Sequence, residues 1–350
     1  MGTATRHTAE LDALTEPTPE PRTRLRRTRT HPHGTRTCTR LLRTLLALLI
    51  ATAVIMPVSA AAAGPQIPAP APATLAAPTP KTLESTYAAN RTNAERASHM
   101  AEAHGDRSRA ATDRAMAAPT RQFLKFDGRG PGQAVEVFGD LLKADRVAVL
   151  VPGSDTSLDT YDRFHKAARA LYDRMGTGTA VIAWLGYETP KTISTTVLTP
   201  TRAEQAAPKL RTFIRDLRGL LPSTAHVTLV CHSYGSVVCG RAAAGLNGVT
   251  DIALIGSPGT GADSAATLHT SARIWAARGT DDWVGMVPHT RADLFGTTVG
   301  FGTDPISPTF GARVFPADNA GHSDYFTPGS LSLEHLARIT LGIAKERTHA

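Results

Sequence analysis

A serine at the junction of an apolar run and a helix-like segment is the best candidate nucleophile in this 350-residue chain. Residues 227–240 read V-T-L-V-C-H-S-Y-G-S-V-V-C-G, and the change of pattern falls at Ser233. A serine on such a sharp turn has a strained backbone and needs small residues two positions before and after it. Gly235 meets this need, and Cys231 is a small residue where glycine is usual. The pattern predicts a nucleophile elbow, with a simple helix cap at Ser233 as the alternative.

A nucleophilic serine requires a histidine base and an acid that orients the histidine. The apolar runs at 251–256 and 272–279 predict two buried strands of a parallel sheet, and T-D-D-W-V follows the second run. Asp282 is the predicted acid because it lies three residues past Gly279, where the turn would direct it inward. Asp281 is the rival acid, and a solvated turn carboxylate is the other interpretation.

The base is expected near the C-terminus, on a loop before the last helix. His322, in N-A-G-H-S-D-Y-F, has this position, and the final helix is predicted in the apolar periodicity of 330–345. His232 lies beside the nucleophile but is expected to point away along the turn. A histidine on the surface is the alternative interpretation of His322.

Backbone amides that stabilise an oxyanion normally come from the residue after the nucleophile and from the loop after an earlier strand. The run R-V-A-V-L-V-P-G-S-D-T at 146–156 supplies such a strand and loop. Gly153 allows close approach of the backbone, so the amides of Ser154 and Tyr234 are the predicted donors. A turn that starts the next helix is the alternative interpretation of this loop sequence.

Several short motifs together resemble a known family. They are V-L-V-P-G-S, C-H-S-Y-G-S, I-G-S-P-G, A-A-R-G-T-D-D-W-V, D-P-I-S-P-T-F-G-A-R and A-G-H-S-D-Y-F. Over about residues 121–345 the chain resembles α/β-hydrolase-fold proteins of unknown function that are common in actinobacteria and often secreted. The resemblance implies Ser233 as nucleophile, Asp282 as acid and His322 as base. Cys231 departs from the glycine usual in that family, and the family brings no substrate with it.

The order of predicted elements indicates an α/β domain over residues 121–350. A hairpin begins near 121 and turns at G-R-G-P-G, and strands then alternate with helices. The predicted elements are strand 146–151, helix 157–174, strand 179–184, helix 201–220, strand 225–231 and helix 234–246. Such alternation predicts a mostly parallel sheet with helices on both faces. Together with the resemblance it predicts the α/β-hydrolase fold with a minimal cap.

Two insertions, at 186–200 and 285–312, are the segments able to form that cap. The pocket is therefore expected to be open and modest. Four bulky residues are candidate walls, each equally compatible with ordinary core packing: Tyr187, Trp283, Met286 and Phe310.

The first 63 residues have the pattern of a leader. Residues 1–43 hold nine arginines, no lysine and four acids, and an apolar run with small residues follows at 40–64. A basic region, an apolar core and a small-residue site, for instance after Ala61 or Ala63, predict a signal peptide. An uncleaved membrane anchor through residues 41–58 is the alternative.

The leader also explains most of the positive charge. Nine arginines less four acids give +5 of the total +8, which leaves about +3 on the rest of the chain. Basic residues interleaved with aromatic residues do not occur, so nucleic acid is not an expected partner.

Residues 64–120 are predicted to connect the leader to the domain. Residues 65–80 form a Pro- and Ala-rich linker that cannot build a core. Residues 82–117 form an Ala-rich, polar helical stretch with a poor apolar face, and we expect this stretch to be loosely packed or mobile.

Three cysteines occur in the chain, and Cys38 falls in the leader. Cys231 and Cys239 remain, an even pair that suits an exported protein. Two buried free thiols are favoured over a disulfide between them. Cysteine and histidine spacings typical of zinc sites and phosphate-binding glycine loops do not occur, so no metal or cofactor is predicted.

The sequence therefore predicts an exported serine hydrolase, secreted or extracytoplasmic, that cleaves a carboxylic ester, with amides and thioesters as alternatives. The expected partner is a small-molecule, lipid or cell-wall ester, and the protein is expected to be a monomer. A catalytically silent hydrolase fold used as a cell-surface binding module is the competing interpretation.

Overall fold

The structure is a computed structural model that describes residues 67–294 and 297–344. The predicted leader at 1–63, with its apolar stretch at 41–58, lies outside the described residues. Within the part of the chain that is described, no helix has the length and apolar character needed to cross a bilayer.

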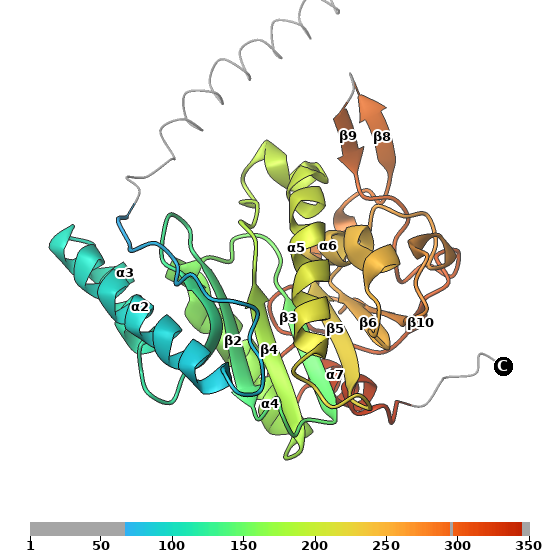
Figure 1. Ribbon diagram of the computed structural model, residues 1–350. Coiled ribbons are helices and arrows are strands. Elements are labelled where there is room, and N and C mark those ends of the chain that lie inside the picture. Colours follow the sequence, from blue (N-terminus) through green and yellow to red (C-terminus); the bar gives the residue numbers. More distant parts are fainter. Residues whose placement is uncertain (1–66, 295–296, 345–350) are drawn as a thin grey trace, which may run out of the picture. The chain divides into compact units, whose positions relative to one another are not determined.

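An eight-stranded sheet in the order β1-β2-β4-β3-β5-β6-β7-β10 forms the centre of the molecule (Figure 1). Its strands are β1 (Gln122–Asp127), β2 (Gln133–Gly139), β3 (Arg146–Val151), β4 (Thr179–Leu185), β5 (His226–His232), β6 (Asp251–Ile255), β7 (Arg273–Ala277) and β10 (Arg313–Val314). The six strands from β4 to β10 run parallel, whereas β1 and β2 form an antiparallel hairpin that joins β4. The predicted mostly parallel sheet is confirmed.

Helices cover both faces of the sheet (Figure 1). The helices are α2 (Leu83–Ala103), α3 (Arg107–Met116), α4 (Tyr161–Met175), α5 (Thr201–Arg218), α6 (Gly235–Ala242) and α7 (Leu331–Leu341). α5 and α6 pack on one face, and α4 and α7 pack on the other. β3 and β5 pair in parallel with Val151 opposite Cys231, so both strands end at the same edge of the sheet.

The central strands are buried on both faces, as their continuous apolar runs require. Along β5, Leu229 contributes to the core under α5 and α6, and Val230 contributes to the core under α4 and α7. This alternation follows from the pleat of a strand, in which successive side chains point to opposite faces. Each such side chain stabilises the fold by about 1.5–3 kcal/mol.

The stretch predicted to be loosely packed forms two ordered helices that pack on the sheet edge, so that prediction is wrong. Ala94 and Ala97 of α2 are fully buried, and small side chains let the helix approach β1 closely. Asn90 Nδ2 donates to Phe123 O at 2.9 Å, and Phe126 N donates to Asn90 Oδ1 at 3.0 Å. The buried side-chain amide of Asn90 thus satisfies two backbone groups at the free edge of β1. A count of apolar residues does not detect this contact.

The Pro- and Ala-rich segment also contacts this part of the molecule. Residues 67–80 have little regular secondary structure, but Asn93 Nδ2 on α2 donates to Ala71 O at 3.2 Å. The folded unit therefore extends further towards the N-terminus than the boundary predicted at 121.

The two insertions lie at the edge where the parallel strands end (Figure 1). Residues 186–200 contain one short 3₁₀ turn, Thr195–Leu198, and 285–312 contains the hairpin of β8 (Arg291–Leu294) and β9 (Thr297–Gly300). Among their described residues neither insertion has an α-helix, which agrees with a minimal cap.

Candidate active site

The predicted elbow has the backbone geometry that a nucleophile turn requires. Ser233 follows the last residue of β5 and has φ of +54°, a left-handed conformation that is uncommon for a residue with a side chain. A Cβ atom on Gly235 would lie 2.4 Å from the carbonyl oxygen of Val151, so only glycine fits two positions after the serine. The turn is held by a hydrogen bond from Ser233 N to Ile255 O at 3.0 Å.

The structure brings Ser233, His322 and Asp282 together in one hydrogen-bonded row. His322 Nε2 lies 2.9 Å from Ser233 Oγ, and His322 Nδ1 lies 2.9 Å from Asp282 Oδ1. The three side chains come from the end of β5, the loop after β7 and the loop before α7. This arrangement allows the imidazole to take the hydroxyl proton while the carboxylate fixes the ring orientation.

Of the two rival acids, Asp282 contacts the histidine. Its side chain is buried, whereas Asp281 is exposed and contacts the hydroxyl of Thr280. Burial by itself would raise the pKa of Asp282, but hydrogen bonds from His322, Tyr325 and the amide of Val284 outweigh burial and lower that pKa below its usual value. Asp282 is therefore a carboxylate at neutral pH.

Tyr325 is a contact of the acid that the sequence reasoning missed. Its hydroxyl donates to Asp282 Oδ2 at 2.5 Å and accepts a hydrogen bond from Gly279 N at 3.2 Å. Burial and the bond to Asp282 raise the pKa of Tyr325, so the phenol stays protonated and remains a donor. The only signal in the sequence is its place three residues after His322.

His232 is also closer to the site than predicted. Its ring does not contact Ser233, but Nε2 donates to the backbone oxygen of His322 at 2.7 Å. The two imidazole rings lie 4.7 Å apart. Burial and the neighbouring His322 lower the pKa of His232 to about 4, so this ring is neutral near pH 7 and supports the loop that holds His322.

The predicted oxyanion loop lies directly against the nucleophile. A Cβ atom on Gly153 would stand 3.0 Å from Ser233 Oγ, so the backbone of this loop approaches the reacting atom closely. Within the described part of the chain, the amides of Ser154 and Tyr234 donate to no protein acceptor. Two free amide donors beside a serine hydroxyl are what an oxyanion site requires.

The two cysteines at the elbow form a disulfide, where the sequence favoured free thiols. Cys231 at the end of β5 bonds to Cys239 in α6, with their Cα atoms 6.5 Å apart. The sequence could not show that α6, after the turn at Ser233, brings Cys239 this close to Cys231 at the end of β5. The bond ties together the strand and the helix on either side of Ser233.

The four candidate wall residues divide into two groups. Tyr187 and Phe310 are buried in the core, and the Tyr187 hydroxyl donates to Pro152 O at 2.7 Å. Trp283 is half-exposed with its ring 4.8 Å from that of His322, and Met286 is largely exposed. Trp283 is thus the one of the four that contacts the row of Ser233, His322 and Asp282.

A family model described as alpha/beta hydrolase matches residues 127–292. The chain has the α/β-hydrolase fold. Within the described residues, no group of three or more His, Cys, Asp or Glu side chains is placed to hold a metal ion.

Two mycobacterial proteins are similar to this chain in sequence. The uncharacterized protein Rv2079 of Mycobacterium tuberculosis is 31% identical over 252 residues, which cover 61% of this chain and 37% of that protein. The uncharacterized protein Rv0963c of the same organism is 34% identical over 143 residues, which cover 37% of this chain and 53% of that protein. The chain thus spans little more than a third of the length of the first of these curated relatives.

Solved structures resemble the chain at low identity. Esterase PE8 has 17% identity and a TM-score of 0.39, covering 59% of this chain and 97% of its own. A predicted hydrolase from Thermoplasma acidophilum has 16% identity and a TM-score of 0.38, covering 64% and 97%.

Proposed function

We propose that this α/β-hydrolase is a serine hydrolase that cleaves a carboxylic ester through an acyl-enzyme on Ser233. The observation that carries the proposal is the continuous row from Ser233 Oγ through His322 to Asp282, with 2.9 Å at both contacts. The strained, positive-φ backbone at Ser233 supports it, because such strain is concentrated at functional sites.

In the acylation step, His322 Nε2 removes the proton of Ser233 as its Oγ attacks the ester carbonyl carbon. Asp282 stabilises the resulting imidazolium through Nδ1, and Tyr325 keeps the carboxylate in place. The amides of Ser154 and Tyr234 donate hydrogen bonds to the carbonyl oxygen and stabilise the negative charge that develops on it.

Collapse of the tetrahedral intermediate breaks the bond between the acyl carbon and the alcohol oxygen. His322 returns its proton to the departing alcohol, which leaves an acyl group on Ser233. Water then attacks the acyl carbon with His322 as base, and the carboxylic acid departs as Ser233 regains its proton.

The small cap favours substrates that reach the serine from an open edge, and we propose a small-molecule, lipid or cell-wall ester, with amides and thioesters as alternatives. We also propose that the protein is exported. The disulfide between Cys231 and Cys239 supports export, because disulfides persist mainly in oxidising compartments.

A panel of p-nitrophenyl esters of increasing acyl length, with the matching anilides, tests the proposal on purified protein. Ester hydrolysis that disappears in Ser233→Ala, while circular dichroism shows an unchanged fold, is the expected result. A folded protein that turns over no ester and no anilide of the panel would instead favour the silent binding module.

A further inference from the structure

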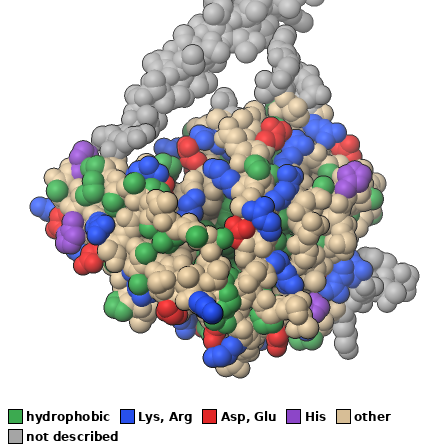
Figure 2. Space-filling model, viewed as in Figure 1, with side chains coloured by type: hydrophobic (Ala, Val, Ile, Leu, Met, Phe, Trp, Pro, Cys, Tyr) green, Lys and Arg blue, Asp and Glu red, His purple; other side chains and the backbone are tan. Residues whose placement is uncertain are grey.

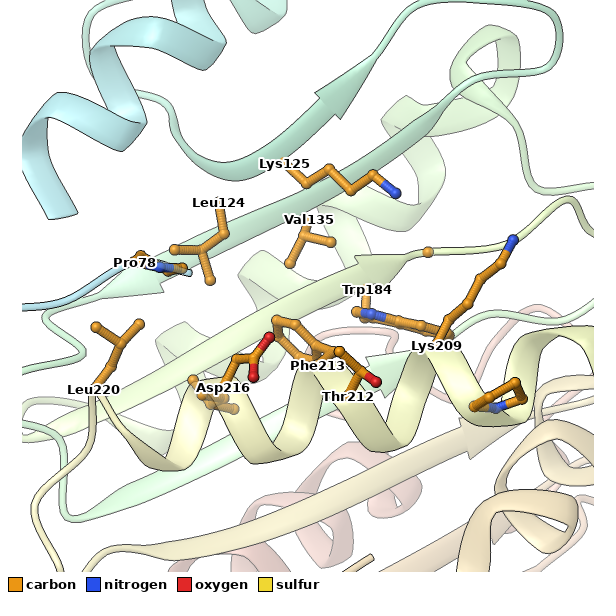
Figure 3. Close-up of a pocket in the computed structure, with 13 residues that line it drawn as sticks. Pro78, Leu124, Lys125, Val135, Trp184, Lys209, Thr212, Phe213, Asp216 and Leu220 are labelled. Atoms are coloured by element: carbon orange, nitrogen blue, oxygen red, sulfur yellow. The ribbon is translucent and has the colours of Figure 1, made fainter. Parts of the chain in front are cut away.

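A second pocket lies outside the Ser233 site, between α5 and the β1–β2 hairpin (Figure 3). Its volume is about 480 Å³, within the roughly 300–1,000 Å³ of small-molecule sites. Apolar residues of β1, β2, β4 and α5 line most of it, and its charged lining residues are Lys125, Lys209 and Asp216. None of these residues belongs to the row of Ser233, His322 and Asp282.

The floor and most walls of the pocket are apolar. Trp184 and Phe213 lie with ring centroids 6.3 Å apart, and aliphatic side chains from β1, β2 and α5 surround them. Trp184 is buried, whereas Leu124 and Phe213 are only partly buried and present apolar surface to the pocket.

Two lysines stand at one end of this apolar surface. Figure 3 shows the ammonium groups of Lys125 and Lys209 on the same side of the pocket, with Asp216 and Leu220 toward the other. Lys125 Nζ donates to Gln133 Oε1 at 2.8 Å, and in the described residues no carboxylate forms an ion pair with either lysine. Partial removal from water and the charge of Lys209 lower the pKa of Lys125, against an opposing effect of Asp127.

Asp216, the single acidic residue that lines the pocket, does not form an ion pair with Lys125 or Lys209. Asp216 forms its ion pair with Arg215 at 3.2 Å. Basic side chains also run along α5 on the face shown in Figure 2. The field at this face therefore attracts anions.

We propose that this pocket binds a long-chain carboxylate. The carboxylate lies between the ammonium groups of Lys125 and Lys209, and the hydrocarbon chain covers Leu124 and Phe213 and extends toward Leu220. A fully apolar ligand would leave both cations without a counter-charge. A small anion would leave the partly buried side chains of Leu124 and Phe213 without a hydrocarbon contact.

Equilibrium dialysis of labelled dodecanoate against the purified protein tests the proposal. Saturable binding that is about tenfold weaker in the double variant K125Q/K209Q is expected, because the two amides cannot supply the positive charge that pairs with the carboxylate. The matched control K143Q/K166Q removes two lysines outside the pocket and should bind like the wild type. Dodecanol should bind at least about tenfold more weakly than dodecanoate.

The Ser233→Ala variant separates this site from the proposed catalytic site. Unchanged dodecanoate binding in Ser233→Ala supports a separate pocket, whether or not the protein hydrolyses esters. Binding lost in Ser233→Ala, equal binding of acid and alcohol, or full binding by K125Q/K209Q would each overturn the proposal.

Discussion

Among the described residues, two almost fully buried carboxylates each contact a histidine, and only one of these two pairs also contacts a nucleophile. Asp282 and His322 meet at 2.9 Å at the edge where the strands end, and Glu136 of β2 and His165 of α4 meet at 3.0 Å beside the hairpin. Both carboxylates are almost fully buried. Distance and burial therefore do not distinguish them.

The other partners of the two carboxylates differ. Glu136 also accepts hydrogen bonds from Nε and Nη2 of Arg121 and from the hydroxyl of Tyr161. Asp282 accepts its remaining bonds from the neutral donors Tyr325 and Val284 N. The charge of Glu136 is already matched by a fixed cation, whereas that of Asp282 is free to stabilise an imidazolium.

The imidazole rings of His322 and His165 also differ in what they contact besides the carboxylate. His322 Nε2 contacts Ser233 Oγ, whereas no serine, threonine or cysteine in the described residues bonds to the ring of His165. A histidine–carboxylate pair thus indicates catalysis when neutral donors hold the carboxylate and a nucleophile contacts the imidazole ring. It indicates a structural role when an arginine neutralises the carboxylate.

The largest expected difference between the pairs is in turnover. His322→Ala should lower kcat by roughly 10⁶-fold, because removal of the base disables the whole triad. His165→Gln should leave kcat within about twofold. Both are measured on the best ester of the panel, and comparable losses in the two variants would erase the proposed distinction.

The acid side gives the next largest effect. Asp282→Asn should lower kcat about 10⁴-fold, because an amide no longer holds the productive tautomer. Asp281→Asn is the matched control and should retain full activity, since that side chain is exposed and does not contact His322. Loss of activity in Asp281→Asn alone would reassign the acid.

On the structural side, Glu136→Gln should lower the free energy of unfolding by about 3–5 kcal/mol, because Arg121 is left without its buried counter-charge. Glu188→Gln removes the partner of Arg202 in an exposed pair and should cost no more than about 1 kcal/mol. Urea denaturation measures both. Equal and small losses would mean that Glu136 is not a structural anchor.

A smaller effect separates the two tyrosines that donate to these carboxylates. Tyr325→Phe should reduce kcat about tenfold, the equivalent of one hydrogen bond to a charged group, with little change in KM. Tyr161→Phe removes the donor to Glu136 and should change stability but not kcat. A kinetic effect of equal size in Tyr161→Phe would contradict the assignment.

The smallest expected effect concerns pH and His232. The pKa of His232 is lowered to about 4 in the folded protein. Between about pH 6.5 and 4, His232 therefore binds a proton in the unfolded chain but not in the folded protein, and the folded state loses stability as pH falls. The loss should be on the order of 1 kcal/mol between pH 7 and 5. Urea midpoints of the wild type should fall more over this range than those of His232→Gln, and identical falls would exclude the effect.

Much of the site was predictable from local pattern. Ser233 could be found because its elbow is a strand, a turn and a helix in sequence, and Asp282 and His322 because they follow later strands in a fixed chain order. The parallel sheet followed from alternating elements.

The parts that were missed depend on contacts across the fold. Tyr325 and His232 act through atoms that only the folded loops bring together. Asn90 makes α2 part of the folded unit through two hydrogen bonds to β1, which no apolar periodicity records. The bond between Cys231 and Cys239 depends on the return of the helix beside the strand.

The central claim is that Ser233 is an activated nucleophile, and a fluorophosphonate probe tests it most directly. The account predicts one adduct per folded chain, mapped by peptide mass spectrometry to Ser233, with labelling strongly slowed in His322→Ala and unchanged in His165→Gln. Folded protein that is not labelled at Ser233, or is labelled equally fast without His322, would contradict it.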